Sequence, residues 1–285
     1  MQQILDHVYI EDSYPGVVLG LIITPHGQVM IDAPFRPDDI RLWRAAMLNL
    51  GGGVERLLIN LDVHADRTIG SRAMECTVVG HEKMAEVFRN RPMTFKAQGA
   101  DTGADWEYHN GLGSIRWAPP EISFTQRMKI HWDEDPLRLE YRPGPAAGAI
   151  WVILEKRGLI FLGDAVVVNQ PPFLAGADIP QWLESLQVLL TPAYQNHLLI
   201  SGRSGLVTHK HVHQQIEYLK NIQARMDELA ARKGEPSETN NWINELLSGF
   251  TFPPERKAQY YQRLKWGLEQ YYNRHYRSTG QELDE

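Results

Sequence analysis

The sequence predicts an α/β fold in which helices cover the sheets. Short apolar runs that end in turn residues alternate with stretches of helical spacing. One such run, Leu57-Leu58-Ile59, leads directly into the polar segment 60–67, which is typical of a site at the carboxyl edge of a sheet. Two pairs of apolar arms, each around a Gly-containing turn, end in Asp32 and Asp164 and indicate two similar halves.

The first half alternates strands and helices. Pro25-His26-Gly27 predicts the turn of a hairpin, and Ile40, Trp43 and Met47 have helical spacing. Gly51-Gly52-Gly53 ends that helix. The expected elements are strands at 9–10, 17–24 and 28–31, a helix at 36–50, a strand at 57–59, a helix at 66–74, a strand at 76–79 and a helix at 82–90.

The segment 91–120 is rich in Gly, Pro, Asp and Trp and predicts a long loop, of the kind that often covers a site. Strands and then helices follow it. The expected elements are strands at 122–124, 126–131, 137–141, 149–154, 159–162 and 197–201, and helices at 179–190, 212–232, 238–247 and 254–276.

Composition narrows the class of protein. The 285 residues are 43% hydrophobic and 22% charged, as in a globular protein. The formal net charge is −6 and no run of Lys or Arg stands out, so we expect no nucleic-acid partner. The N-terminal stretch lacks the features of a signal peptide, the apolar runs are too short to span a bilayer, and Cys76 is the lone cysteine. We therefore expect a cytoplasmic protein without a membrane partner.

Asp62, His64 and Asp66 follow the buried strand at a spacing of two residues. In extended chain this spacing puts all three side chains on the same side. Carboxylates and an imidazole together can bind a divalent metal ion or transfer protons.

Seven stretches follow one another in a recognisable order between about residue 5 and residue 207. They are the hairpin ending at Asp32, LLINLDVHADRTIG at 57–70, VVGHE at 78–82, the loop 143–148, FLGDAV at 161–166, IPQWLESL at 179–186 and the loop 202–205. In this series the chain resembles the metallo-β-lactamase superfamily, of the hydrolase type that includes glyoxalase II. The resemblance implies a four-layer αββα sandwich with extra C-terminal helices.

The family's metal motif is His-x-His-x-Asp-His, followed by a distant His, a bridging Asp and a last His. Here the motif reads Asp62-Val63-His64-Ala65-Asp66-Arg67. Pro145 stands at the distant His, Asp164 matches the bridging Asp, and Arg203 stands at the last His. Pro and Arg side chains do not bind cations, so the resemblance implies a degenerate metal site.

Two outcomes follow from the substitutions. Asp62, His64 and Asp164 can form one weak, open site for zinc, iron or manganese, or the chain binds no metal. The family's site holds two metal ions, and at the second one this chain has Arg67 and Arg203 in place of two metal ligands. We hypothesise that these guanidinium groups form salt bridges with Asp66 and Asp164, and so neutralise them without a metal.

Two functions stay open. One is a hydrolase with at most one metal, acting on a small anionic ester-type substrate. Asp66 is then the general base, His64 a metal ligand or acid/base group, and Arg67, Arg203 and Tyr14 the substrate contacts. The other is a non-catalytic binding or regulatory protein for a small-molecule ligand, with the arginines replacing the metal.

The domain organisation expected is a metallo-β-lactamase-like domain at 1–211 and a helical extension at 212–285 packed on it. The last helix carries many aromatic side chains, including Tyr260, Trp266 and Tyr271. Packing on the domain explains them, with a homodimer contact through the C-terminal helices as the further possibility. The tract Thr208–His213 predicts a solvated helix start, since spacing two separates its His residues on a helix.

Overall fold

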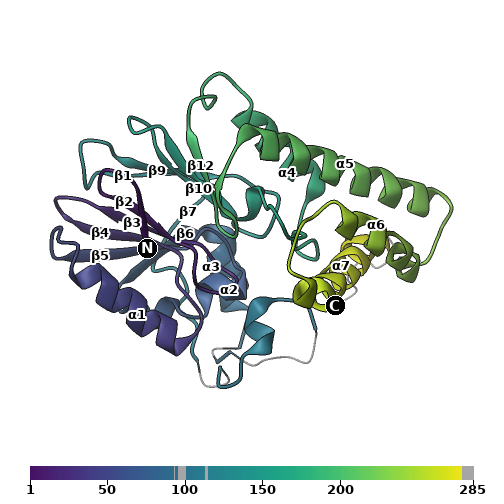
Figure 1. Cartoon of the computed structure of the whole chain (residues 1–285), viewed down its shortest axis with the longest axis horizontal. Coiled ribbons are helices and arrows are strands. Elements are labelled where there is room, and N and C mark those ends of the chain that lie inside the picture. The colour runs from purple at the N-terminus through teal and green to yellow at the C-terminus, as the bar shows by residue number, and fades with distance from the viewer. Residues whose placement is uncertain (93, 96–100, 113–114, 278–285) are drawn as a thin grey trace.

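The structure of the chain is a computed structural model that describes residues 1–92, 94–95, 101–112 and 115–277. It is a sandwich of two mixed sheets with helices on both outer sides, which confirms the predicted fold class (Figure 1). The predicted loop at 91–120 falls partly outside the described residues. Its described part contains a single 3-10 turn, η2 (Asp105–Tyr108), and a bridge between Thr94 and Arg116.

The first sheet has seven strands in the order of the chain. They are β1 (Gln2–Leu5), β2 (Val8–Glu11), β3 (Leu19–Ile23), β4 (Gly27–Ile31), β5 (Glu55–Ile59), β6 (Thr77–His81) and β7 (Ile122–Phe124). The second sheet has six strands in the order β13-β12-β11-β10-β9-β8. They are β8 (Arg127–Ile130), β9 (Leu137–Tyr141), β10 (Ile150–Leu154), β11 (Leu159–Phe161), β12 (Leu198–Ser201) and β13 (Gly205–Val207).

The two halves predicted from the paired apolar arms share one topology. In the first sheet the hairpin β3–β4 is followed by the helix α1 (Pro37–Leu48) and by β5, which is parallel to β4. In the second sheet the hairpin β10–β11 is followed by α4 (Ile179–Leu189) and by β12, which is parallel to β11. The residues after β4 and after β11 therefore occupy equivalent positions at the sheet edges.

Apolar side chains pack between the two sheets and between each sheet and the helices on its outer face. Strand β10 shows why, because Ile150, Val152 and Leu154 face the other sheet while Trp151 and Ile153 face the outer helices. The first sheet packs its outer face on α1. These contacts bury the central strands β3, β4, β10 and β11 on both faces, which explains their nearly continuous apolar runs in the sequence.

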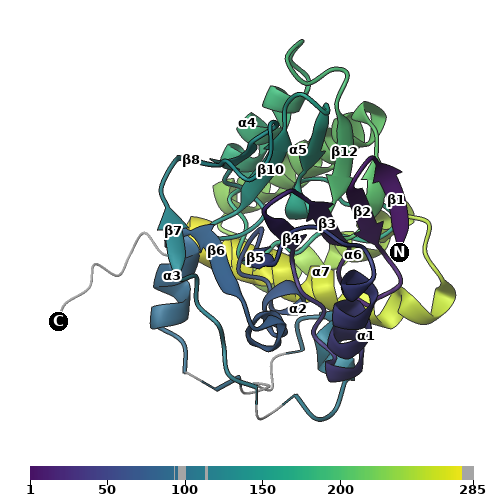
Figure 2. The same cartoon turned by 90° about the vertical axis from the view of Figure 1, so that its left-hand side faces the viewer.

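Further helices complete the outer layers and the C-terminal part. They are α2 (Ala65–Thr68), η1 (Ser71–Met74), α3 (Glu82–Arg89), η3 (Gly163–Ala165), α5 (His209–Ala231), η4 (Pro236–Trp242), α6 (Ile243–Ser248), η5 (Pro254–Arg256), α7 (Lys257–Tyr272) and η6 (Asn273–Arg277). Figures 1 and 2 show α4 and α5 on one side of the sheets and α1 to α3 on the other. Among the described helices, none combines the length and the apolar character needed to cross a bilayer.

The C-terminal helices pack on the second sheet through α4 and α5. Helix α5 begins at His209, three residues before the predicted start at 212. Tyr260, Leu264, Leu268 and Tyr271 of α7 are buried in the same apolar cluster as α4 and α5. Packing on this cluster therefore accounts for the tyrosines of α7, whereas Trp266 is not part of it. The division into domains at residue 211 and the homodimer stay predictions.

The predicted helix at 66–74 is wrong in detail, since it is divided into α2 and η1. Gly70 lies at the division, where a Cβ atom would come within 1.9 Å of the carbonyl oxygen of Pro34. The chain after β4 thus passes so close to Gly70 that a larger residue would not fit at this position. The short strand β13 was not predicted.

Candidate functional site

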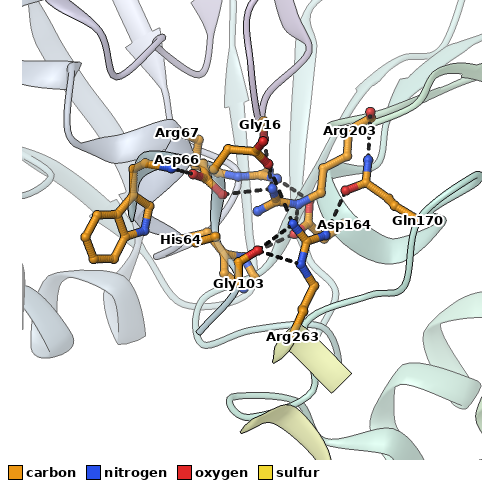
Figure 3. Close-up of polar contacts among 12 residues, drawn as sticks. Gly16, His64, Asp66, Arg67, Gly103, Asp164, Gln170, Arg203 and Arg263 are labelled. Carbon is orange, nitrogen blue, oxygen red and sulfur yellow. Dashed lines mark hydrogen bonds and ion pairs between the residues drawn. The ribbon is translucent and has the colours of Figure 1, made fainter. Parts of the chain in front are cut away.

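Three segments meet at one edge of the two sheets. They are the chain from β5 into α2, the turn η3 after β11, and the loop 202–204 after β12. Each follows a buried strand, so the strands position the polar side chains at the edge as the sequence predicted. Figure 3 shows the carboxylates and guanidinium groups of these segments pointing toward one another.

Arg67 lies at the centre of this edge with a side chain that is 0% exposed. Its Nη1 donates to Oδ2 of Asp32 over 3.1 Å, and its Nη2 donates to Oδ1 of Asp164. Its Nε lies 3.3 Å from Oδ1 of Asp62. One guanidinium group therefore touches three carboxylates.

Glycines make room for this guanidinium group. A Cβ atom on Gly202 would lie 2.9 Å from Nη1 and 3.0 Å from Nη2 of Arg67. A Cβ atom on Gly163, which has a φ of +58°, would lie 3.3 Å from Nη1. The site is thus shaped around an arginine at position 67.

Arg203 binds the other carboxylates of the site. Its Nε donates to Oδ2 of Asp164 over 2.7 Å, and its Nη1 donates to Oδ2 of Asp66 over 2.9 Å and to the carbonyl oxygen of Gly16 over 2.8 Å. Asp66 also accepts a hydrogen bond from the backbone N–H of Trp106, over 3.2 Å. The salt bridges hypothesised for Arg203 are therefore present, and Arg67 forms its predicted pair with Asp164.

His64 joins Asp62 and Asp164. Its Nδ1 lies 3.0 Å from Oδ1 of Asp62 and 3.2 Å from Oδ2 of Asp164. The backbone N–H of His64 also donates to Oδ1 of Asp62 over 2.9 Å. The potential ligand atoms of these three residues all lie within 4.8 Å of one another. Among the described residues, this is the one group of three or more such side chains that could hold a metal ion.

The buried carboxylates of the site fall into two groups, one with lowered and one with raised pKa values. Burial raises the pKa of Asp62 and Asp164, but their arginine neighbours and His64 outweigh burial and hold both pKa values below the ordinary range. Burial raises the pKa of Asp32 to about 7, because its main cationic partner, Arg67, is shared with two other carboxylates. Burial also raises the pKa of Asp66, although Arg203 partly offsets it.

Residues outside the predicted site cover it. Phe173 packs on His64, with ring centroids 5.1 Å apart, and lies against the guanidinium groups of Arg203 at 4.5 Å and Arg263 at 4.1 Å. Arg263 comes from α7 and donates to the carbonyl oxygen of Gly103 from Nε over 3.1 Å and from Nη2 over 2.9 Å (Figure 3). The C-terminal helices thus reach into the site.

A small polar pocket of about 200 Å³ has Arg203 in its lining. Tyr14 lines it, from the loop between β2 and β3, which agrees with its predicted position facing the site. Arg256 of η5 lines it too and donates from Nη1 to Oδ1 of Asp105 over 2.5 Å. The other lining side chains are mostly polar: Asp12, Gln170, Ser204 and Tyr260 among them.

Solved structures with the same architecture carry the metallo-β-lactamase name. A metallo-β-lactamase family protein from Thermus thermophilus superposes with a TM-score of 0.64 at 21% identity, over 95% of this chain and 94% of that one. A metallo-β-lactamase from Pontibacter korlensis gives 0.59 at 19% identity, over 77% of this chain and 98% of that one.

This chain has the metallo-β-lactamase fold. At these identities the similarity establishes the fold alone. The sec-alkyl sulfatase PisA1 also matches, with a TM-score of 0.61 at 14% identity, over 95% of this chain and 49% of that one. No family model and no curated protein matches the sequence.

The metallo-β-lactamase fold implies divalent metal ions at this edge of the sheets, and the side chains present fit a pair of ions poorly. Both oxygens of Asp164 accept from guanidinium groups, and Oδ2 of Asp66 is bound to Arg203. A second cation there would face two fixed positive charges. A single ion fits better. Asp62, His64 and Asp164 converge, and Oδ2 of Asp62 is buried without a hydrogen-bond partner among the described residues.

Sequence patterns gave no sign of Arg263, Phe173 or Arg256. Each lies far along the chain from the metal-motif segment, and none sits in a motif. Asp32 stood out because it ends a hairpin, but its contact with Arg67 depends on the parallel pairing of β4 with β5. His81 serves packing, since it accepts from the N–H of Lys83 at the start of α3 and stacks on Tyr141.

Proposed function

We propose that this chain is a binding protein on the metallo-β-lactamase fold, in which Arg67 and Arg203 replace the metal ions. The observation that supports this most is the state of Asp164, whose two oxygens both accept from guanidinium groups. A carboxylate that is neutralised on both oxygens has little left to offer a metal. The two guanidinium groups thus offset part of the negative charge of the buried carboxylates without a metal ion.

We propose a small anion, such as a carboxylate or phosphate, as the ligand. The pocket beside Arg203 supports this class because Arg203 and Arg256 both line it, together with the hydroxyl groups of Tyr14 and Ser204. Guanidinium groups bind carboxylate and phosphate oxygens through paired N–H donors. A volume of about 200 Å³ limits the ligand to a small molecule.

Elemental analysis of the purified protein tests the absence of metal, and we expect zinc, iron and manganese far below one ion per chain. Thermal unfolding with a panel of small carboxylates and phosphate tests binding. A bound anion should raise the unfolding temperature. Arg256→Gln should abolish that rise, since Arg256 lines the pocket, is 38% exposed and pairs with Asp105, not with the carboxylates that Arg67 and Arg203 bind. No stabilisation by any anion, or stoichiometric metal, would contradict the proposal.

A hydrolase with one metal ion is the second candidate. The unpartnered, buried Oδ2 of Asp62 favours it, since a cation held by Asp62, His64 and Asp164 would satisfy that oxygen. Such an ion would lower the pKa of a bound water toward neutrality. Asp66, the proposed general base, already has both oxygens in hydrogen bonds, to Arg203 and to the N–H of Trp106.

The two candidates differ in metal content and in turnover. The hydrolase requires about one ion per chain, and turnover of an ester, thioester, lactone or phosphodiester that is lost in both Asp62→Asn and Asp66→Ala. Turnover that survives Asp66→Ala would remove Asp66 from the mechanism. Stoichiometric metal without turnover would leave a metal-binding protein in place of an enzyme.

A further inference from the structure

A second concave surface lies beside α1, the helix that covers the outer face of the first sheet. It is a groove of about 580 Å³ between α1 and the segment that contains η1. Figure 1 shows α1 at the outer margin of the molecule, at the lower left. The lining residues, which we call the α1 groove, are Pro37, Ile40, Arg41, Arg44, Ala45, Leu48, Ile69, Arg72, Ala73, Glu75, Ile115 and Arg116.

One face of α1 forms a whole wall of the α1 groove. Six of its lining residues fall at the i, i+3, i+4, i+7, i+8 and i+11 positions from Pro37 to Leu48. This spacing is that of a single stripe along a helix, and 12 residues make a wall roughly 18 Å long. The adjacent stripe, with Trp43 and Met47, is buried on the sheet.

The floor of the α1 groove is apolar, while an exposed leucine stands at its edge. Ile40 is 6% exposed and Ile69 is 0% exposed, so both are fixed by the core beneath them. Leu48 is 74% exposed. An exposed apolar side chain beside an apolar floor leaves a surface that an apolar ligand would remove from water.

The charged residues that line the α1 groove are mostly cationic. Four arginines and one glutamate line it. Arg44 pairs with Glu75 over 2.6 Å, and Arg41 pairs with Asp38. Within the described residues, no carboxylate pairs with Arg72 or Arg116. The groove therefore combines an apolar floor with two cations available for a ligand.

We infer that the α1 groove binds a small amphipathic anion, such as a medium-chain carboxylate. Its apolar chain lies on Ile40, Ile69 and Leu48, and its anionic group pairs with Arg72 and Arg116. A volume of about 580 Å³ lies within the range of small-molecule sites. The inference is independent of the proposed function, because its residues and those of the pocket beside Arg203 do not overlap.

Calorimetric titration of the full chain with decanoate tests the inference. Acetate and decyltrimethylammonium are the comparison ligands, since the first lacks the chain and the second reverses the charge. We expect decanoate to bind and both comparison ligands to bind at least about tenfold more weakly. Decyltrimethylammonium binding as tightly as decanoate would overturn the role of the arginines. The absence of decanoate binding would overturn the site itself.

Matched variants locate the binding. Leu48→Glu and Arg72→Glu should each weaken decanoate binding by about tenfold or more. Leu42→Glu is the control, because Leu42 is on the same helix and 61% exposed but does not line the groove. Arg256→Gln should leave decanoate binding unchanged. Equal effects of Leu42→Glu and Leu48→Glu would overturn the assignment. So would an acidic amphipathic peptide that binds the groove when decanoate does not.

Discussion

Arg203 donates from Nε to Oδ2 of Asp164 over 2.7 Å, with side chains that are 1% and 4% exposed. This ion pair joins the loop after β12 to the turn η3 after β11. Because Oδ1 of the same carboxylate accepts from Arg67, Asp164 links the two arginines across the interface between the sheets. The contact therefore ties the stability of the sandwich to the charged side chains at this edge of the sheets.

Loss of Arg203 should destabilise the protein strongly. Arg203→Met removes the cation while Asp66 and Asp164 stay buried, and breaking a buried pair in this way costs about 3–5 kcal/mol. Urea unfolding measures the loss. Arg41→Met is the control, since its pair with Asp38 is exposed and contributes about 0–1 kcal/mol. Equal stabilities of the two variants would show that Arg203 is dispensable to the fold.

A methyl group at Gly202 should be harmful, although the position has ordinary backbone angles. The Cβ atom of Gly202→Ala would lie 2.9 Å from Nη1 of Arg67, whose guanidinium group is held by three carboxylates and has no room to withdraw. We expect a loss of about 1–3 kcal/mol in thermal or urea unfolding. Gly176→Ala is the control, because nothing lies within 4 Å of the added atom. A fully stable Gly202→Ala would mean that Arg67 is mobile.

The strands and the metal-motif segment could be predicted because their signals are local. A buried strand reads as a short apolar run, and the polar residues that follow it read as a sheet edge. Arg67 and Arg203 could be paired with carboxylates in advance because the resemblance places positions 66, 67, 164 and 203 close together at one edge of the sheets. The partner that escaped was Asp32, which reaches Arg67 over 3.1 Å only after β4 and β5 are placed side by side.

The cover of the site could not be predicted, for a different reason. Arg263 lies on a helix whose pattern is explained by packing, and nothing in its spacing separates a buried arginine from an exposed one. Its position depends on α7 folding back so that Arg263 contacts Phe173 at 4.1 Å. Contacts of this kind are set by how helices dock, and helix docking has no short sequence signature.

Asp32 should give the protein a stability component that decreases with pH. Its pKa is about 7 in the folded state and near 3.8 when unfolded, so between these values the folded state binds the extra proton. The stabilisation is complete below about pH 3.8 and is lost as pH rises to about 7. Asp32→Asn lacks it. The stability difference between the native protein and this variant should therefore fall by up to about 4 kcal/mol between pH 4 and 8.

Urea unfolding at a series of pH values measures this difference, in which the titration of Asp62, Asp66 and Asp164 largely cancels. The titrations of Asp62 and Asp164 change the stability in the opposite direction. Their lowered pKa values give stability that is lost as the pH falls below the ordinary pKa of an aspartate. A difference that stays constant with pH would mean that Asp32 is ionised throughout, and that Arg67 neutralises all three of its carboxylates.

A histidine in place of Arg203 should create a metal site. Arg203→His removes one fixed positive charge and supplies an imidazole beside Asp66 and Asp164. Both carboxylates then lose their contact with the guanidinium group of residue 203. Two carboxylates and one imidazole are a ligand set that zinc accepts. We expect zinc in the purified variant to rise toward one ion per chain, as measured by elemental analysis. Arg203→Met is the control, since it frees the same carboxylates without adding a nitrogen ligand. If Arg203→His holds no more zinc than Arg203→Met, Arg67 alone suffices to exclude the metal, because its guanidinium group remains bound to Asp164.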